Sequence, residues 1–386
     1  MPVIDVAVYL LICFGLFKVV SQLVNAAWSH NLPIPPRPNR LPIIGNVLSI
    51  PKHAAWKAYA EWSRRENSDL VGIQILGQLS IVVNTKKAAQ ELFERRSSVY
   101  ADRPQLAMNV LTGWDFTTAF TAYSDEWRAQ RKIFHQSLNA RAATTHHPVQ
   151  LEKVELLVKC LHDEPDDFAR HMRRYAASIA MVIAYGYNTE TNDDHFVDVA
   201  KKASHASSSP TVRYLPDWFP GAGFKIRAKE CMALIAEMQE GPIAYVKRSM
   251  RERTRHPYHY ERVVQTVCRA ILHNPDDYPD PESFKPERFL TAEGNINEDE
   301  VQVAFGLGRR NCVGMHMANA TLWIMMASLL AIFDISKAKD EGGNEIPVDI
   351  AYTDNLVSTS LPFRCAIRPR DREAEELIQQ IGHSKN

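Results

Sequence analysis

One ten-residue segment limits what this chain can fold into more than any other feature. Residues 305–314 read FGLGRRNCVG and match the pattern F-x-x-G-x-R-x-C-x-G at every fixed position. Five fixed residues in so short a segment occur by chance in roughly one such chain in ten thousand. The segment therefore predicts a loop with two fixed glycines that presents Cys312 directly before an apolar helix.

The cysteine in this pattern is typical of an iron ligand. A thiolate is a soft anion that pushes electron density onto a metal. Backbone N–H groups of a tight loop and of the following helix start can stabilise the negative sulfur. A lone cysteine is more often an inert buried side chain, but the fixed residues around Cys312 argue against that interpretation. A zinc site using Cys312 and His316 lacks two further ligands at any usual spacing.

The other fixed residues suit a flat, anionic cofactor such as heme. Gly308 and Gly314 permit a turn and a close approach of the backbone. Arg310 can pair with a propionate, and Phe305 can pack beside the sulfur and exclude water. The segment thus predicts Cys312 as a metal ligand within a site for such a cofactor.

Composition places the chain among globular proteins. It has 386 residues, 45% of them hydrophobic and 23% charged, which suits a substantial core. Lys and Arg number 45, as do Asp and Glu, so charge gives no reason to expect nucleic acid as a partner. Six cysteines lie far apart without a C-x-x-C pair, which favours reduced thiols on the cytosolic side.

The amino terminus predicts a membrane anchor. Residues 6–24 form a largely apolar run close to the ~20 residues that span a bilayer as a helix, although Lys18 and Gln22 weaken it. A cleaved signal peptide fits poorly, since no positive region precedes the run and no small-residue cleavage site follows. An ordinary buried helix is disfavoured by the stiff, proline-rich spacer that comes next. We expect an anchor at 1–26, a hinge at 27–46 and one domain at 47–386.

The remaining pattern predicts a mainly α domain with a small β component. Residues 71–75 and 80–83 are β-branched runs that suggest a hairpin, and Thr85 is expected to cap a helix reaching residue 95. The stretch 314–333 predicts a core helix buried in protein rather than a second membrane span. Further helices are predicted at 54–65, 125–138, 151–162, 172–185 and 225–250.

The decapeptide resembles the heme-binding loop of the cytochrome P-450 superfamily. Residues 127–131, WRAQR, match the family's W-x-x-x-R helix. Residues 100–104, YADRP, resemble its Asp-Arg-Pro element, and 278–281 with 284–289 resemble the meander before the heme loop. The proline spacer and residues 214–225 are similar to fungal microsomal members of specialised metabolism.

This resemblance implies a fold, a chemistry and partners. The cofactor implied is heme b, with Cys312 as the axial ligand of its iron and with Trp127, Arg131 and Arg310 holding its propionates. The reaction implied is insertion of one oxygen atom from O₂ into a small hydrophobic substrate, in secondary metabolite biosynthesis. Electrons would come from an NADPH-dependent flavoprotein reductase at the endoplasmic reticulum membrane, where one N-terminal anchor leaves the domain cytosolic.

The chain departs from the family near 250–263. The oxygen-activating motif (A/G)-G-x-(D/E)-T-(T/S) is missing, and the two short E-x-x-R matches, at 61–64 and 252–255, lie in the wrong context. A block between Met250 and Val263 is therefore predicted to be absent. Its loss should expose apolar faces on neighbouring helices and leave Arg288 as an uncompensated charge near the core.

Three outcomes follow from that departure. The chain is a working monooxygenase, or a non-catalytic heme-binding or heme-free membrane-anchored remnant, or a heme-thiolate enzyme that transforms peroxides or oximes without O₂ activation. In each case the cytochrome P-450 type fold is predicted to be incomplete. The identity of the substrate does not follow from the residues.

Overall fold

The computed structural model divides the chain into two compact units, residues 1–100 with 263–310 and residues 101–262 with 311–386. The predicted anchor lies outside the described residues apart from 15–16, as do residues 214–222 of the segment that is similar to fungal members and the junction at 250–263. The described residues are 15–16, 34–41, 44–51, 54–75, 78–104, 107–189, 194–206, 223–249, 270–297, 299, 301–348, 351–353 and 359–383.

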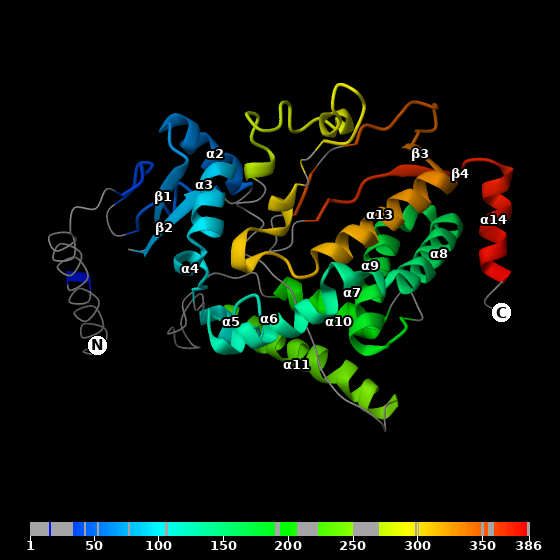
Figure 1. Cartoon of the computed structure of the whole chain (residues 1–386), viewed down its shortest axis with the longest axis horizontal. Coiled ribbons are helices and arrows are strands. Elements are labelled where there is room, and N and C mark those ends of the chain that lie inside the picture. The colour runs from blue at the N-terminus through cyan, green and yellow to red at the C-terminus, as the bar shows by residue number, and fades with distance from the viewer. Residues whose placement is uncertain are drawn as a thin grey trace, which may run out of the picture. The chain divides into compact units, whose positions relative to one another are not determined.

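The first unit joins a hairpin to short helices (Figure 1). The strands pair antiparallel, with Leu70 opposite Val83 and Ile75 opposite Gln78, which confirms the predicted hairpin. Thr85 caps the next helix, because its hydroxyl accepts a hydrogen bond from the Ala88 N–H at 3.2 Å. The elements are α2 (Ala55–Arg65), β1 (Leu70–Ile75), β2 (Gln78–Val83), α3 (Lys86–Gln90), the π-helix η1 (Glu91–Arg95), α4 (Ser97–Tyr100), and the 3₁₀ turns η3 (Pro286–Phe289), η4 (Gln302–Phe305) and η5 (Gly308–Arg310).

The second unit is a helical assembly with one small sheet (Figure 1). Its two strands pair antiparallel, with Phe333 opposite Pro369 and Lys337 opposite Cys365. The elements are α5 (Ala107–Thr112), α6 (Asp125–Leu138), α7 (Ala140–Thr144), α8 (His147–Asp163), η2 (Pro165–Asp167), α9 (Phe168–Tyr185), α10 (His195–Ala206), α11 (Gly223–Ser249), α13 (Met315–Ile332), β3 (Phe333–Lys337), β4 (Cys365–Pro369) and α14 (Arg372–His383). The mainly α fold with a small β component is confirmed.

The main core of the second unit lies where α8, α9 and α13 pack together. Burying each Leu or Ile side chain there contributes ~1.5–3 kcal/mol. Gln150 of α8 is fully buried among these side chains, and its Nε2 donates to the Met317 carbonyl at 3.2 Å and to Thr321 Oγ1 at 2.6 Å. The buried members are Val154, Leu157, Val158, Leu161, Tyr175, Ile179, Ile324, Leu329, Ile332, Phe333, Ile367, Ala374 and Ile378.

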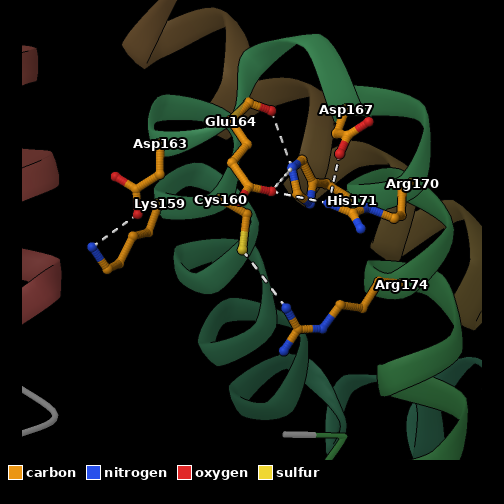
Figure 2. Close-up of polar contacts among 8 residues, drawn as sticks. All are labelled: Lys159, Cys160, Asp163, Glu164, Asp167, Arg170, His171 and Arg174. Atoms are coloured by element: carbon orange, nitrogen blue, oxygen red, sulfur yellow. Dashed lines mark hydrogen bonds and ion pairs between the residues drawn. The ribbon is translucent and has the colours of Figure 1, made fainter. Parts of the chain in front are cut away.

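A polar cluster ties α8 to α9 at the turn between them, as Figure 2 shows. Arg170 donates to the carboxylates of Glu164 at 3.0 Å and Asp167 at 2.6 Å. The ring of His171 is buried, and its Nε2 lies 3.1 Å from the Glu164 carbonyl, so Nε2 carries the proton that it donates. This cluster fixes the angle between two helices that support α13.

The helix predicted at 314–333 is present as α13, but the prediction that it is buried in protein is wrong. Ile324, Leu329 and Ile332 are buried, whereas Trp323 is 70% exposed and Leu330 is 59% exposed. The helix is apolar on all sides, and within the second unit it packs along only one of them. Among the described residues, α13 is also the one helix long and apolar enough to cross a membrane, by length and composition alone.

Candidate heme-binding site

Cys312 lies in the second unit, in the loop that leads into α13 (Met315–Ile332). Gly314 is the N-cap of that helix, and its backbone N–H donates a hydrogen bond to the Cys312 sulfur. Burial raises the pKa of the Cys312 thiol, while the Gly314 N–H and the positive charge of Arg131 act in the opposite direction. Both opposing groups favour negative sulfur, so they suit a thiolate once a metal cation stabilises it.

Arg131 holds the residue next to this cysteine. It donates from Nη1 to the Asn311 carbonyl at 2.7 Å and from Nη2 to Asn311 Oδ1 at 2.9 Å. Its guanidinium also lies over the ring of Trp127, 5.7 Å from the centroid. Trp127 and Arg131 are four residues apart on α6 (Asp125–Leu138), which places them on one face of the helix.

One hydroxyl cap and two carboxylates fix the start of α6. Ser124 Oγ accepts from the Trp127 N–H at 3.2 Å, and Asp125 lies in the first turn, where negative charge is favourable. Asp102 Oδ1 accepts from the Tyr123 N–H at 2.7 Å and from the Arg103 N–H at 2.8 Å. The Asp-Arg-Pro segment therefore sets where α6 begins, and with it the position of Trp127.

The earlier half of the decapeptide belongs to the first unit. Gly308 has φ of +62°, and a Cβ atom there would lie 1.7 Å from the Phe93 carbonyl oxygen. Only glycine fits that combination of left-handed backbone and close approach. Phe305 ends η4 and is half-buried, and Arg310 ends η5. A glycine is therefore required at position 308 by the turn and by the nearby Phe93 carbonyl.

The prediction for Arg288 is wrong. Its guanidinium is only partly buried and donates to the backbone carbonyls of Pro279, Asp280, Ser283 and Lys285, at 3.0 to 3.3 Å. The meander that carries this arginine curls around it and supplies acceptors locally. The side chain is therefore compensated without a partner from a distant helix.

Asn311 was missed by sequence reasoning, because it occupies a variable position of the motif. Asp102 had a signal, since it belongs to the YADRP segment, but its role in positioning α6 depends on a residue 21 positions away. Among the described residues, no group of three or more His, Cys, Asp or Glu side chains could hold a metal ion. A heme iron needs only one protein ligand of the Cys312 kind.

The residues present fit the ligand side of a heme. The sulfur of Cys312 is half-buried, receives an N–H from Gly314, and has the Arg131 cation nearby. Within the second unit, Cys312 would ligate the iron, and Arg131 and Trp127 would lie on the side of a propionate. The structure brings Trp127, Arg131, Asn311 and Cys312 together within the second unit.

A family sequence model described as Cytochrome P-450 matches the chain over residues 35–260 and 259–355. The two matched stretches cover most of the chain and meet at residues 259 and 260. That meeting point lies within the interval between Met250 and Val263.

Curated fungal proteins are similar along almost the whole length. A cytochrome P-450 monooxygenase of Armillaria gallica is 28% identical over 482 residues, covering 91% of this chain and 94% of the relative. Cytochrome P-450 monooxygenase 98 of Postia placenta is 28% identical, covering 97% and 98%. Tryptamine 4-monooxygenase of Psilocybe cyanescens is 25% identical, covering 90% and 95%. Since 482 aligned positions exceed the 386 residues of the chain, the relatives have positions without a counterpart here.

Proposed function

Because this chain belongs to the cytochrome P-450 family of heme-dependent monooxygenases, we propose that Cys312 is the axial thiolate of its heme and that its substrate is a small hydrophobic molecule of fungal specialised metabolism. Heme, when bound, supplies the O₂-activating chemistry. The protein supplies the ligand, the orientation of the cofactor and the exclusion of water. The fungal relatives, including one named for action on tryptamine, support the substrate class.

The observation that carries this proposal is the clamp of Arg131 on Asn311. Two hydrogen bonds, at 2.7 and 2.9 Å, fix both the backbone and the side chain of the residue that precedes Cys312. Because the Arg131 guanidinium makes two hydrogen bonds to Asn311, which directly precedes Cys312, it limits where the Cys312 sulfur can lie. The Gly314 N–H then holds the sulfur at the amino end of α13.

The same proposal includes the partners of the family. Cytochrome P-450 monooxygenases generally take electrons from a reductase, and we infer an NADPH-dependent flavoprotein at the endoplasmic reticulum membrane. The apolar run at residues 6–24, followed by the proline spacer, supports a single N-terminal anchor with a cytosolic domain. Trp127, Arg131 and Arg310 are proposed to hold the propionates.

A second candidate is a heme-binding or heme-free chain without turnover. Two observations favour this candidate. The alignment with the Armillaria gallica relative has 482 positions, more than the 386 residues of this chain. The family match is also divided into two stretches, at residues 259 and 260. Within the second unit α13 packs along only one side and Trp323 is 70% exposed, which is the pattern that loss of a covering helix leaves. We propose that the missing block lies between Met250 and Val263 and limits activity.

The test is the carbon-monoxide difference spectrum of the dithionite-reduced, membrane-expressed chain. A Soret band at the position that gives the family its name, which is characteristic of thiolate ligation, is expected, and Cys312→Ser should lose it. NADPH-dependent product formation with reductase would then support the monooxygenase. The same band without turnover would support the second candidate, and turnover with peroxide alone would indicate the peroxide-transforming class. Full protein expression without any heme band would overturn the ligand proposal.

A further inference from the structure

Asp102 lies well before α6 in the sequence, yet it holds the backbone at the amino end of that helix. Its Oδ1 accepts hydrogen bonds from the Tyr123 N–H at 2.7 Å and from the Arg103 N–H at 2.8 Å. The bond to Arg103 is local, but the bond to Tyr123 spans 21 positions and is therefore a tertiary contact. Tyr123 directly precedes Ser124, the N-cap of α6, so the carboxylate fixes the chain where the helix begins.

The charge and the setting of Asp102 suit this position. The amino end of a helix carries unpaired backbone N–H groups and the positive end of the dipole, so a carboxylate nearby is favourable. Arg103 precedes Pro104, which favours an extended backbone, and Ala101 on the other side is 4% exposed. The segment that carries Asp102 is therefore fixed at both sides and can serve as a support for the helix.

From Tyr123, contacts continue along one face of α6 to the loop that carries the cysteine. Tyr123, Trp127 and Arg131 are spaced by four residues, and the ring centroids of Tyr123 and Trp127 lie 5.0 Å apart. The Arg131 guanidinium lies 5.7 Å from the Trp127 centroid and donates to Asn311 at 2.7 and 2.9 Å. All of these residues belong to the second unit.

We propose that Asp102 is a positioning residue for Cys312, acting through Tyr123 and the direction of α6. The inference deepens the proposed function and rests on it, because the place of the Cys312 sulfur matters as that of the heme ligand. Asp102 sets the angle at which α6 reaches the ligand loop. Arg131 passes that angle on, through its two hydrogen bonds to Asn311.

The geometry makes the ligand loop sensitive to the angle of α6. Arg131 lies eight residues beyond Tyr123, or about 12 Å along the axis, so a tilt of about 5° at the start moves Arg131 by about 1 Å. Hydrogen bonds from N–H to oxygen span about 2.7–3.2 Å and weaken beyond that range. Such a shift would break the bonds to Asn311, so the exposed carboxylate of Asp102 controls a loop that it does not contact.

Hydrogen exchange of the full-length chain, followed by mass spectrometry, tests this role without requiring heme. Asp102→Ala should speed exchange about three- to tenfold in peptides covering residues 121–128 and residues 311–317. Asp102→Asn keeps an oxygen that accepts the Tyr123 N–H, so its exchange should stay within about twofold of the unaltered chain. Asp115→Ala, at an exposed position of the segment before α6, is the matched control and should change neither peptide.

Two results would overturn the proposal. Acceleration confined to residues 121–128 would mean that Asp102 holds only the start of the helix. Equal acceleration in Asp102→Asn and Asp102→Ala would mean that the accepting oxygen is not what matters. Tyr123→Leu keeps the backbone bond to Asp102 but removes the ring contact with Trp127, and it should also speed exchange at 311–317. This variant decides the proposal if Asp102→Ala does not fold, and unchanged exchange of the loop would then count against it.

A double-mutant cycle shows whether Asp102 acts through Arg131. In the Arg131→Ala background, Asp102→Ala should change exchange at 311–317 by less than about twofold, because the contact that carries the effect is already lost. In the Lys132→Ala background, which removes an exposed cation of the same helix, Asp102→Ala should keep its full effect. Additive losses in the Arg131→Ala background would contradict the positioning role.

The carbon-monoxide difference spectrum separates this inference from the proposed function. If the unaltered chain gives the thiolate band, Asp102→Ala should lower the fraction of heme that gives it by about threefold or more, and Asp102→Asn should keep it. A band that is unchanged in Asp102→Ala would refute the positioning role and leave the proposed function standing. If the unaltered chain binds no heme, the ligand role of Cys312 fails, and hydrogen exchange still decides whether Asp102 holds the loop.

Discussion

Arg131 grips Asn311 at both its backbone carbonyl and its side-chain oxygen, across 180 positions of sequence. The hydrogen bond to the Asn311 carbonyl positions the backbone directly before Cys312. The second hydrogen bond, to Asn311 Oδ1, fixes the orientation of that residue relative to α6. Trp127 supports the guanidinium from beneath. The conformation of the ligand loop therefore depends on α6, a helix from a distant part of the chain.

Removing this clamp should lower heme retention. Each hydrogen bond to a charged group contributes about 1.5–3 kcal/mol, so Arg131→Ala should retain heme at least tenfold more weakly, and Asn311→Ala, which loses one bond, less so. Heme-to-protein ratio after gel filtration is the measurement. Arg128→Ala is the control, because Arg128 pairs with Asp125 on the exposed side of the same helix. Equal heme content in Arg131→Ala and Arg128→Ala would refute the clamp.

Gly308 should tolerate no side chain, for two separable reasons. Gly308→Ala combines left-handed strain with a clash against the Phe93 carbonyl, and should cost more than about 3 kcal/mol of unfolding free energy. Gly294→Ala has φ of +81° with nothing within 4 Å, so it isolates the strain at about 1 kcal/mol. Urea unfolding of both variants gives the difference. Matching losses would mean that the close approach to Phe93 contributes nothing.

Gln150 should be a stability residue rather than a catalytic one. Gln150→Leu keeps the volume but removes both hydrogen bonds to α13, which should cost about 1–3 kcal/mol. Gln136→Leu, at an exposed position of α6, should change stability by less than about 0.5 kcal/mol. Thermal unfolding followed by circular dichroism compares them. A Gln150→Leu protein as stable as the unaltered chain would show that these bonds do not hold α13.

Alkaline pH should destabilise the second unit through Tyr175. Burial raises the pKa of Tyr175 from 10.0 to about 12, and its hydroxyl donates to the Thr321 carbonyl at 3.3 Å. A raised folded-state pKa gives stabilisation that is complete below pH 10 and is lost as pH rises toward 12. Tyr175→Phe should be about 1 kcal/mol less stable at pH 8 but lose less on going to pH 11. The exposed Tyr352→Phe serves as control, and an unaltered alkaline loss in Tyr175→Phe would contradict the assignment.

Local patterns in the sequence predicted the elements that depend on local interactions. The bounds of α6 match the predicted 125–138, and the Thr85 cap and the hairpin are present. Helix periodicity, capping residues and β-branched runs act over a few residues, so they can be read directly from the sequence. The heme loop was predicted for a related reason, since its fixed residues lie within ten positions.

Contacts between residues far apart in the chain could not be predicted from local sequence patterns. The composition of α13 predicted an apolar helix, but its packing on one side only was decided by which partners the second unit offers. Arg288 was predicted to lack compensation, yet the meander folds its own carbonyls around it. In both cases the outcome depends on the path of the backbone in three dimensions.

The sequence by itself determined the family, the cysteine that is proposed to ligate heme, and the identity of the helices around it, because these follow from short patterns with a physical cause. Only the tertiary structure decided that Arg131 holds Asn311, that Gly308 lies against the Phe93 carbonyl, and that α13 packs along only one side within the second unit. Those relationships join residues far apart in the chain. They form only when tertiary packing brings these residues into contact, because hydrogen bonds and close contacts depend on distance in space rather than separation in sequence.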